Sequence, residues 1–85
     1  MKGILDNGFE FEVRDTAAND WELLKVLRKI DRGEEDYIID AAELLLGEEQ
    51  LERLEKYVEK DGVTPLTEMI SCIKEVFEKA RPAKN

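Results

Sequence analysis

Apolar residues recur every three or four positions through most of the chain after Asn19, and three glycines, Gly33, Gly47 and Gly62, interrupt this periodicity. Such spacing places the apolar side chains of a segment on one face of an α-helix. Glycine adopts the positive φ angles found just past helix ends, so it is typical of the points where helices stop. The pattern therefore predicts about four short helices, at residues 19–31, 35–46, 48–60 and 65–80.

Each predicted helix carries its own apolar stripe. The first helix, which Asn19 or Asp20 can cap, presents Leu23, Leu24, Leu27 and Ile30. The last helix presents Leu66, Met69, Ile70, Ile73, Val76, Phe77 and Ala80. Segment 35–46 is apolar on more than one side, which is typical of a helix with neighbours on several faces. We therefore expect segment 35–46 to be central.

Residues 2–13 predict a β-hairpin. The second half of the segment alternates apolar and acidic side chains, the period-two pattern of a strand with one buried face. The alternating residues are Phe9, Glu10, Phe11, Glu12 and Val13. Asn7-Gly8, just before them, favours a tight turn because both residues tolerate positive φ.

Two hairpin registers are compatible with this turn. A two-residue turn pairs Ile4 with Phe11, whereas a three-residue loop with Gly8 in the left-handed region pairs Leu5 with Phe9. We favour the second register, because it also brings residues of opposite charge together at the far end of the strands. The sequence thus predicts a mainly α-helical α+β domain, with a hairpin packed on about four helices.

A chain of 85 residues fits one domain. We assign residues 1–81 to that domain and expect residues 82–85 to fray. The longest apolar run is far shorter than the ~18 residues that a membrane-spanning helix needs, and the N-terminus lacks the apolar core of a signal peptide. These features predict a cytoplasmic protein without a membrane partner.

Negative charge is concentrated in one part of the chain. The segment from Glu34 to Glu55 contains nine acids and one base, Arg53, so it carries the whole net charge of −8. Phosphate binding requires a basic face, so we do not expect a nucleic-acid partner. A solvated acidic face is the simplest interpretation of the segment. Its residues Glu48, Glu49 and Glu52 are candidates for contact with a basic partner.

The residue inventory argues against catalysis. The chain has no histidine and a single cysteine, Cys72. This excludes the commonest general base, every Cys–His nucleophile pair and a structural zinc site. The stretch 31–43 resembles a calcium loop, but Asp36 and Ala42 stand at its sixth and twelfth positions, where such loops need glycine and glutamate. We therefore expect no enzyme activity, no metal and no cofactor, with Cys72 as a small buried side chain.

Most aromatic residues of so small a domain are needed in its core, which we expect of Phe9, Phe11 and Tyr57. Trp21 is the exception, because it precedes the main apolar stripe of its helix. An exposed tryptophan is a frequent interface residue. We therefore add Trp21 to the candidate partner-binding residues.

Four short stretches, taken together and in order, carry a family resemblance. They are Met1-Lys2-Gly3 followed by Asn7-Gly8-Phe9, then Asp20-Trp21-Glu22-Leu23-Leu24, then Leu45-Leu46-Gly47-Glu48-Glu49-Gln50, and last Asp61-Gly62-Val63 before Met69. In this order and spacing, residues 1 to about 78 resemble small tail assembly chaperones of long-tailed phages and prophages of Gram-positive bacteria. The sequence departs from the family pattern around residues 37–43.

The resemblance implies a non-enzymatic assembly factor. Members of this family coat the long, helical tape-measure protein while the tail tube polymerises and then leave, so the mature virion lacks them. They are often made in two lengths through a translational frameshift. The family has no catalytic residues to transfer. A homo-oligomer is compatible with the sequence, since the hairpin's open edge can pair with another subunit.

A second hypothesis comes from the charge alone. A small acidic protein can imitate DNA and block a basic site on a nuclease or regulator. That hypothesis predicts carboxylates aligned along an exposed ridge, whereas the chaperone hypothesis predicts an apolar groove for a helical client.

Overall fold

The computed structural model describes residues 1–80 and confirms the prediction of a mainly helical domain with an N-terminal hairpin. The predicted fraying of residues 82–85, and the assignment of Arg81 to the domain, lie outside the described residues. The elements are β1 (Lys2–Ile4), β2 (Glu10–Glu12), α1 (Asp15–Ala18), α2 (Trp21–Asp31), the 3₁₀ turn η1 (Glu35–Tyr37), α3 (Ile38–Leu46), α4 (Glu48–Val58) and α5 (Leu66–Ala80).

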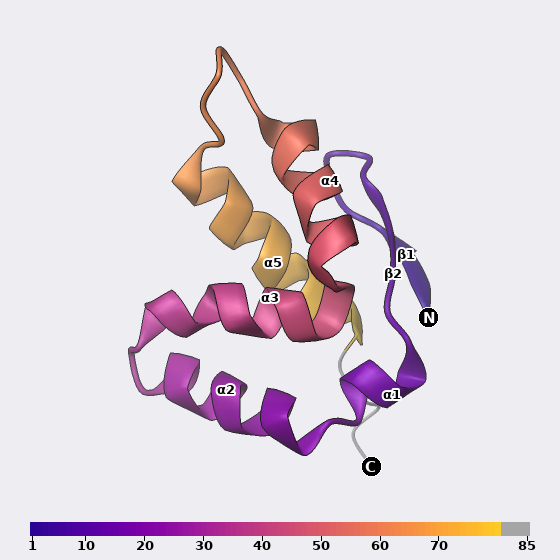
Figure 1. Cartoon of the computed structure of the whole chain (residues 1–85), viewed down its shortest axis with the longest axis vertical. Helices are drawn as coiled ribbons and strands as arrows, with labels where there is room; N and C mark the ends of the chain where they lie inside the picture. The colour runs from indigo at the N-terminus through magenta and orange to yellow at the C-terminus, as the bar shows by residue number, and fades with distance from the viewer. Residues whose placement is uncertain (81–85) are drawn as a thin grey trace.

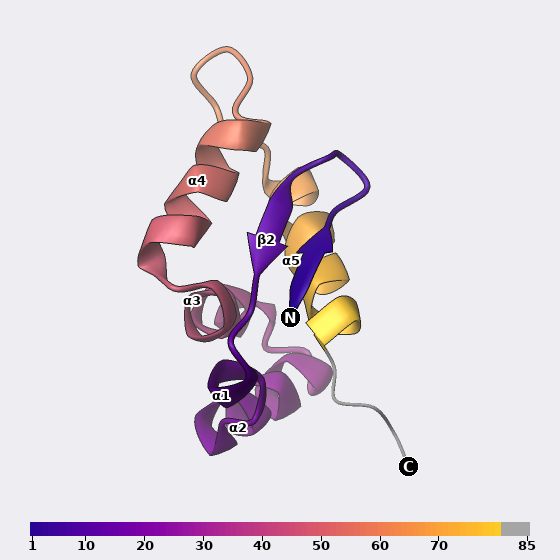
Figure 2. The same cartoon turned by 90° about the vertical axis from the view of Figure 1, so that its right-hand side faces the viewer.

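Helix α3 occupies the middle of the molecule, with α2 on one side and α4 and α5 on the other (Figure 1). The hairpin lies against α5 and beside α4 (Figure 2). Hydrogen bonds attach its turn to these helices: Tyr57 donates to the Asn7 carbonyl at 2.9 Å, and the amide of Asp6 donates to the Glu75 carboxylate at 3.0 Å. Because α3 contacts α2, α4 and α5, the predicted central position of segment 35–46 is confirmed.

The core gathers apolar side chains from the hairpin and every long helix. Leu54, Val13 and Val76 are its largest fully buried members. Helix α3 buries Ile38, Ala41, Ala42, Leu45 and Leu46, more residues than any other element, because it has neighbours on several faces. No charged side chain is buried among residues 1–80, so the core is held together by apolar burial.

The hairpin has the favoured register. The Leu5 amide donates to the Phe9 carbonyl at 2.9 Å, and the Gly8 amide donates to the Leu5 carbonyl at 2.8 Å. Gly8 has a φ of 92°, as the three-residue loop requires. Lys2 lies opposite Glu12 at the other end of the strands.

Gly3 allows the ring of Phe11 to lie across the hairpin. The two residues are cross-strand partners, and a Cβ atom added at Gly3 would come within 2.6 Å of the Phe11 Cζ atom. Because Phe11 is only 3% exposed, its ring has no free space into which it can move. We therefore expect Gly3→Ala to lower the free energy of unfolding by about 1–3 kcal/mol, the usual effect of overpacking a core.

Urea unfolding of Gly3→Ala, with Lys2→Ala on the same strand as the control, tests this expectation. The Lys2 side chain is exposed, so its removal should leave the midpoint within error of the parent. An unchanged midpoint for Gly3→Ala would contradict the packing described.

Local structure departs from the predicted boundaries in several places. Helix α2 begins at Trp21 and not at residue 19, because Asp20 is its N-cap. The four-residue helix α1 was not predicted, because it is too short to show periodicity. The predicted helix at 35–46 begins as a 3₁₀ turn and becomes α-helical at Ile38. Helix α4 ends at Val58, before the predicted residue 60, because Lys60 and Val63 exchange backbone hydrogen bonds across a tight turn with positive φ at Asp61 and Gly62.

Three expectations about burial are wrong. Leu66, assigned to the apolar stripe of the last helix, is 73% exposed as the first residue of α5. Leu24 is 56% exposed and does not belong to the core, because α2 turns Leu23 and Val26 inward. Tyr57 is 52% exposed, although its ring edge contacts Phe9 with the centroids 5.3 Å apart. The phenolic hydroxyl holds the Tyr57 side chain at the surface through its bond to Asn7.

Candidate functional site

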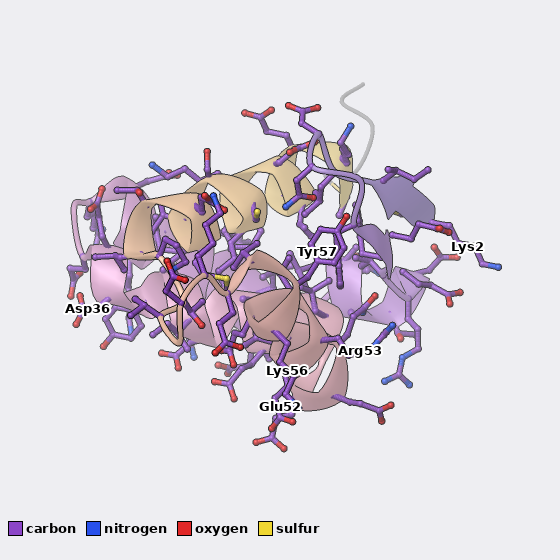
Figure 3. The ribbon with its side chains drawn as sticks, turned by 90° about the horizontal axis from the view of Figure 1, so that it is seen from above. Lys2, Asp36, Glu52, Arg53, Lys56 and Tyr57 are labelled. Carbon is purple, nitrogen blue, oxygen red and sulfur yellow. The ribbon has the colours of Figure 1, made fainter. Side chains whose placement is uncertain are left out.

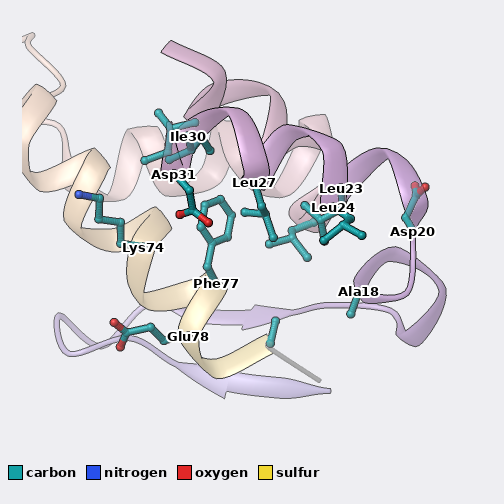
Figure 4. A pocket seen from close by; sticks show the side chains of 13 residues that line it. Ala18, Asp20, Leu23, Leu24, Leu27, Ile30, Asp31, Lys74, Phe77 and Glu78 are labelled. Atoms are coloured by element: carbon teal, nitrogen blue, oxygen red, sulfur yellow. The ribbon is translucent and has the colours of Figure 1, made fainter. Parts of the chain in front are cut away.

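An apolar groove of about 390 Å³ separates α2 from the C-terminal half of α5 (Figure 4). Leu24, Leu27 and Ile30 line it from α2, and Phe77 lines it from α5. Leu27, Ile30 and Phe77 are only partly buried. The groove is thus an open surface whose walls are apolar side chains of two helices far apart in the sequence.

The sequence of α2 explains why the groove exists. Its apolar residues cover more of the helix circumference than one neighbour can bury. Leu23 and Val26 face the core, where α2 packs on α3 and η1, whereas Leu24 remains 56% exposed. Trp21, the first residue of α2, is 71% exposed and does not line the groove, although its neighbour Asp20 does. Exposed apolar residues that adjoin a groove are typical of interaction sites.

Carboxylates stand at both ends of the groove. Asp20 lies at one end and Asp31 at the other (Figure 4). Helix α5 adds one base and one acid, Lys74 and Glu78. Within residues 1–80, no ion pair shorter than 4.0 Å involves these four side chains. The Asp20 carboxylate also caps α2, accepting a hydrogen bond from the Glu22 amide at 2.9 Å.

The structure does not bring the four predicted partner-binding residues together. Trp21 is on α2, whereas Glu48, Glu49 and Glu52 are on the first turns of α4, and α3 lies between the two helices (Figure 1). The three acids are exposed, and Glu52 points away from the body of the molecule (Figure 3). None of the three forms an ion pair with another described residue. They form an acidic surface separate from the groove.

Sequence reasoning missed Leu24, Leu27 and Phe77 as surface candidates, since all three were assigned to buried stripes. The available signal was the excess width of the α2 stripe, which includes Trp21 and Val26 as well as leucines. The position of Phe77 opposite α2 depends on the tertiary arrangement and has no local signal.

Cys72 is 8% exposed, as expected of a small buried side chain. Burial raises the pKa of its thiol, and the nearby negative charges of Glu75 and Glu68 raise it further. A hydrogen bond from the Asn7 side chain to Sγ at 3.5 Å opposes this only in part. The neutral thiol is therefore favoured at neutral pH, and the neutral form is a poor nucleophile.

Residues 1–80 contain no group of three or more histidine, cysteine or carboxylate side chains placed to hold a metal ion. Over the same residues, no helix has the length and apolar character needed to cross a membrane. Comparison of the chain with protein-family models, curated proteins and solved structures finds no match. The resemblance to tail assembly chaperones therefore stays a prediction, and the groove is the feature from which function can be argued.

Proposed function

We propose that this protein is a phage tail assembly chaperone that binds the tape-measure protein through the groove between α2 and α5. It keeps that long helical client soluble in the host cytoplasm while the tail tube polymerises, and it is absent from the finished virion. The protein acts as a binding factor and not as an enzyme.

The observation that carries this proposal is an open apolar groove whose wall includes a strongly exposed leucine, Leu24. An amphipathic helix docks in such a groove by inserting residues spaced three and four positions apart. Leu24, which lines the groove and is 56% exposed, supplies apolar area that this docking would bury. The resemblance of the four sequence stretches to tail assembly chaperones gives independent support for the tape-measure protein as the client.

Co-expression of the tape-measure protein with and without this chain tests the proposal. We expect the client to be soluble and to co-purify only when the chain is present. Leu24→Glu should reduce the co-purified client more than tenfold, because burying one leucine contributes about 1.5–3 kcal/mol. Purified virions should contain none of the protein.

Ile39→Glu is the matched control. Ile39 is 58% exposed, nearly the same as Leu24, and it does not line the groove. The control should retain the client, which separates a groove effect from the effect of an added surface charge. An equally insoluble client in the presence of the parent chain, or equal loss with both variants, would contradict the proposal.

A second candidate function is binding of a basic protein site by imitation of DNA. It is favoured by the exposed carboxylates of Glu48, Glu49 and Glu52, which have no ion-pair partner among residues 1–80. Replacement of all three by glutamine would abolish capture of a nuclease or repressor under this hypothesis. The same triple variant should leave tape-measure binding in the groove intact if the chaperone proposal is correct.

A further inference from the structure

We propose that the α2–α5 groove selects a helix of about three turns that carries two basic residues, eleven positions apart, on either side of two apolar residues. This inference rests on the proposed function, because it specifies the part of the client that the groove binds. The recognised segment has the sequence form Lys-x-x-x-Leu-x-x-Leu-x-x-x-Lys. Arginine can replace either lysine, and another large apolar residue can replace either leucine.

The pattern follows from four groove-lining residues on α2, namely Asp20, Leu24, Leu27 and Asp31. Positions separated by four, seven and eleven residues lie on one face of a helix, because eleven residues complete almost exactly three turns. With a rise of 1.5 Å per residue, the two aspartates are about 16 Å apart along the helix axis. The groove thus presents two apolar residues between two terminal carboxylates (Figure 4).

A helix that lies along α2 meets these positions in the same order. Apolar residues in its middle contact Leu24, Leu27 and, across the groove, Phe77. Basic residues one and a half turns to either side reach Asp20 and Asp31. The remaining groove charges, Lys74 and Glu78, cancel, so the net charge of the groove is that of the two aspartates. The pattern reads the same in reverse, so a client helix can dock in either direction.

The same spacing disfavours a second copy of this chain as the occupant. If a second α2 lies antiparallel along the groove, Leu24 meets Leu27 but Asp20 meets Asp31. If it lies parallel, each aspartate meets its own equivalent. Both arrangements place like charges together, which destabilises a complex. A basic, heterologous helix removes this repulsion, and the protein's net charge of −8 also attracts it at long range.

Three helical peptides test the inference, with binding followed by calorimetry and by the fluorescence of Trp21. The first has the pattern given above. The second has the same composition with its lysines moved to the opposite face, and the third has glutamates in place of the lysines. Since an exposed ion pair contributes a factor of about 1.5 to 5, the first peptide should bind about threefold to tenfold more tightly than the second. The third should bind most weakly.

Variants of the protein test whether Asp20 and Asp31 cause the difference in affinity between the first two peptides. Asp20→Asn removes a charge and keeps the helix cap, because asparagine caps as well as aspartate does. Asp20→Asn combined with Asp31→Asn should abolish the discrimination between the first two peptides. Glu55→Gln combined with Glu59→Gln removes the same net charge from the surface of α4 and the residue after it, away from the groove, and should leave the discrimination intact. Equal binding of all three peptides, or equal loss with both double variants, would overturn the inference.

These outcomes are separable from those of the proposed function. Peptide discrimination by the parent chain, together with failure to solubilise the tape-measure protein, would reject that client and retain the recognised pattern. Client binding that depends on Leu24 without any peptide discrimination would retain the proposed function and reject the pattern.

Discussion

Leu54→Ala is expected to lower the free energy of unfolding by about 3–5 kcal/mol, as Leu→Ala changes do at well-packed core sites. Leu54 is fully buried on α4, where it is the largest of the side chains without solvent exposure. Truncation removes its apolar burial and leaves a cavity, because tightly packed neighbours relax only in part. A domain of this size has a total stability of roughly 4–13 kcal/mol, so the variant should be close to its unfolding limit.

Urea unfolding gives the measurement: the midpoint should fall while the slope stays similar. Leu24→Ala is the control, because Leu24 is 56% exposed and its truncation should have little effect on stability. A Leu54→Ala midpoint equal to that of the control would show that α4 does not pack as described. The same logic separates Ile73, which is 3% exposed, from Leu27, which is only partly buried and lines the groove. Ile73→Ala should be the more destabilising of these two.

Features fixed by local chemistry were predictable from the sequence. The pairing of Leu5 with Phe9 and of Lys2 with Glu12 selected the hairpin register that the structure shows, with Gly8 at positive φ. Asp20, one of the two proposed caps, binds the Glu22 amide in the first turn of α2. The exposure of Trp21 also followed from its place at the start of a helix.

The sequence predicted less well which face of α2 is buried against the core. Adjacent residues Leu23 and Leu24 both satisfy helical periodicity, and only packing on α3 decides that Leu23 is buried and Leu24 exposed. Adjacent residues lie about 100° apart around a helix, so the rotation of α2 about its own axis decides which side chains line the surface. Short elements such as α1 and η1 have too few residues for a periodic signal.

The candidate site depends on tertiary structure even more strongly. Its walls combine Leu27 on α2 with Phe77 on α5, and no sequence pattern states that these residues face one another. The sequence did indicate one component of this site, the wide apolar stripe of α2. It also indicated a concentration of acids in another part of the chain. The acids lie on a different surface because α3 separates α2 from α4.

Gly47→Ala is expected to lower the free energy of unfolding by about 2–3 kcal/mol. Gly47 lies between α3 and α4 with φ 80° and ψ 158°, a combination that glycine adopts and L-residues rarely do. Its amide donates to the Glu43 carbonyl at 2.9 Å, and its carbonyl accepts from the Leu51 amide at 3.0 Å. The corner cannot relax easily, because Leu46 and Leu51 on either side are buried.

The predicted cost comes from backbone conformation and not from crowding, since a Cβ added at Gly47 meets no atom within 4 Å. Chemical synthesis of the chain with D-alanine at position 47 separates these causes, because D-residues favour positive φ. The L-alanine chain should show the lower urea midpoint, and the D-alanine chain should recover most of the lost stability. Equal destabilisation by both residues would mean that conformational strain at the α3–α4 corner is not the cause. A parent-like midpoint for Gly47→Ala would show that the corner can adopt a negative φ without disturbing the packing of Leu46 and Leu51.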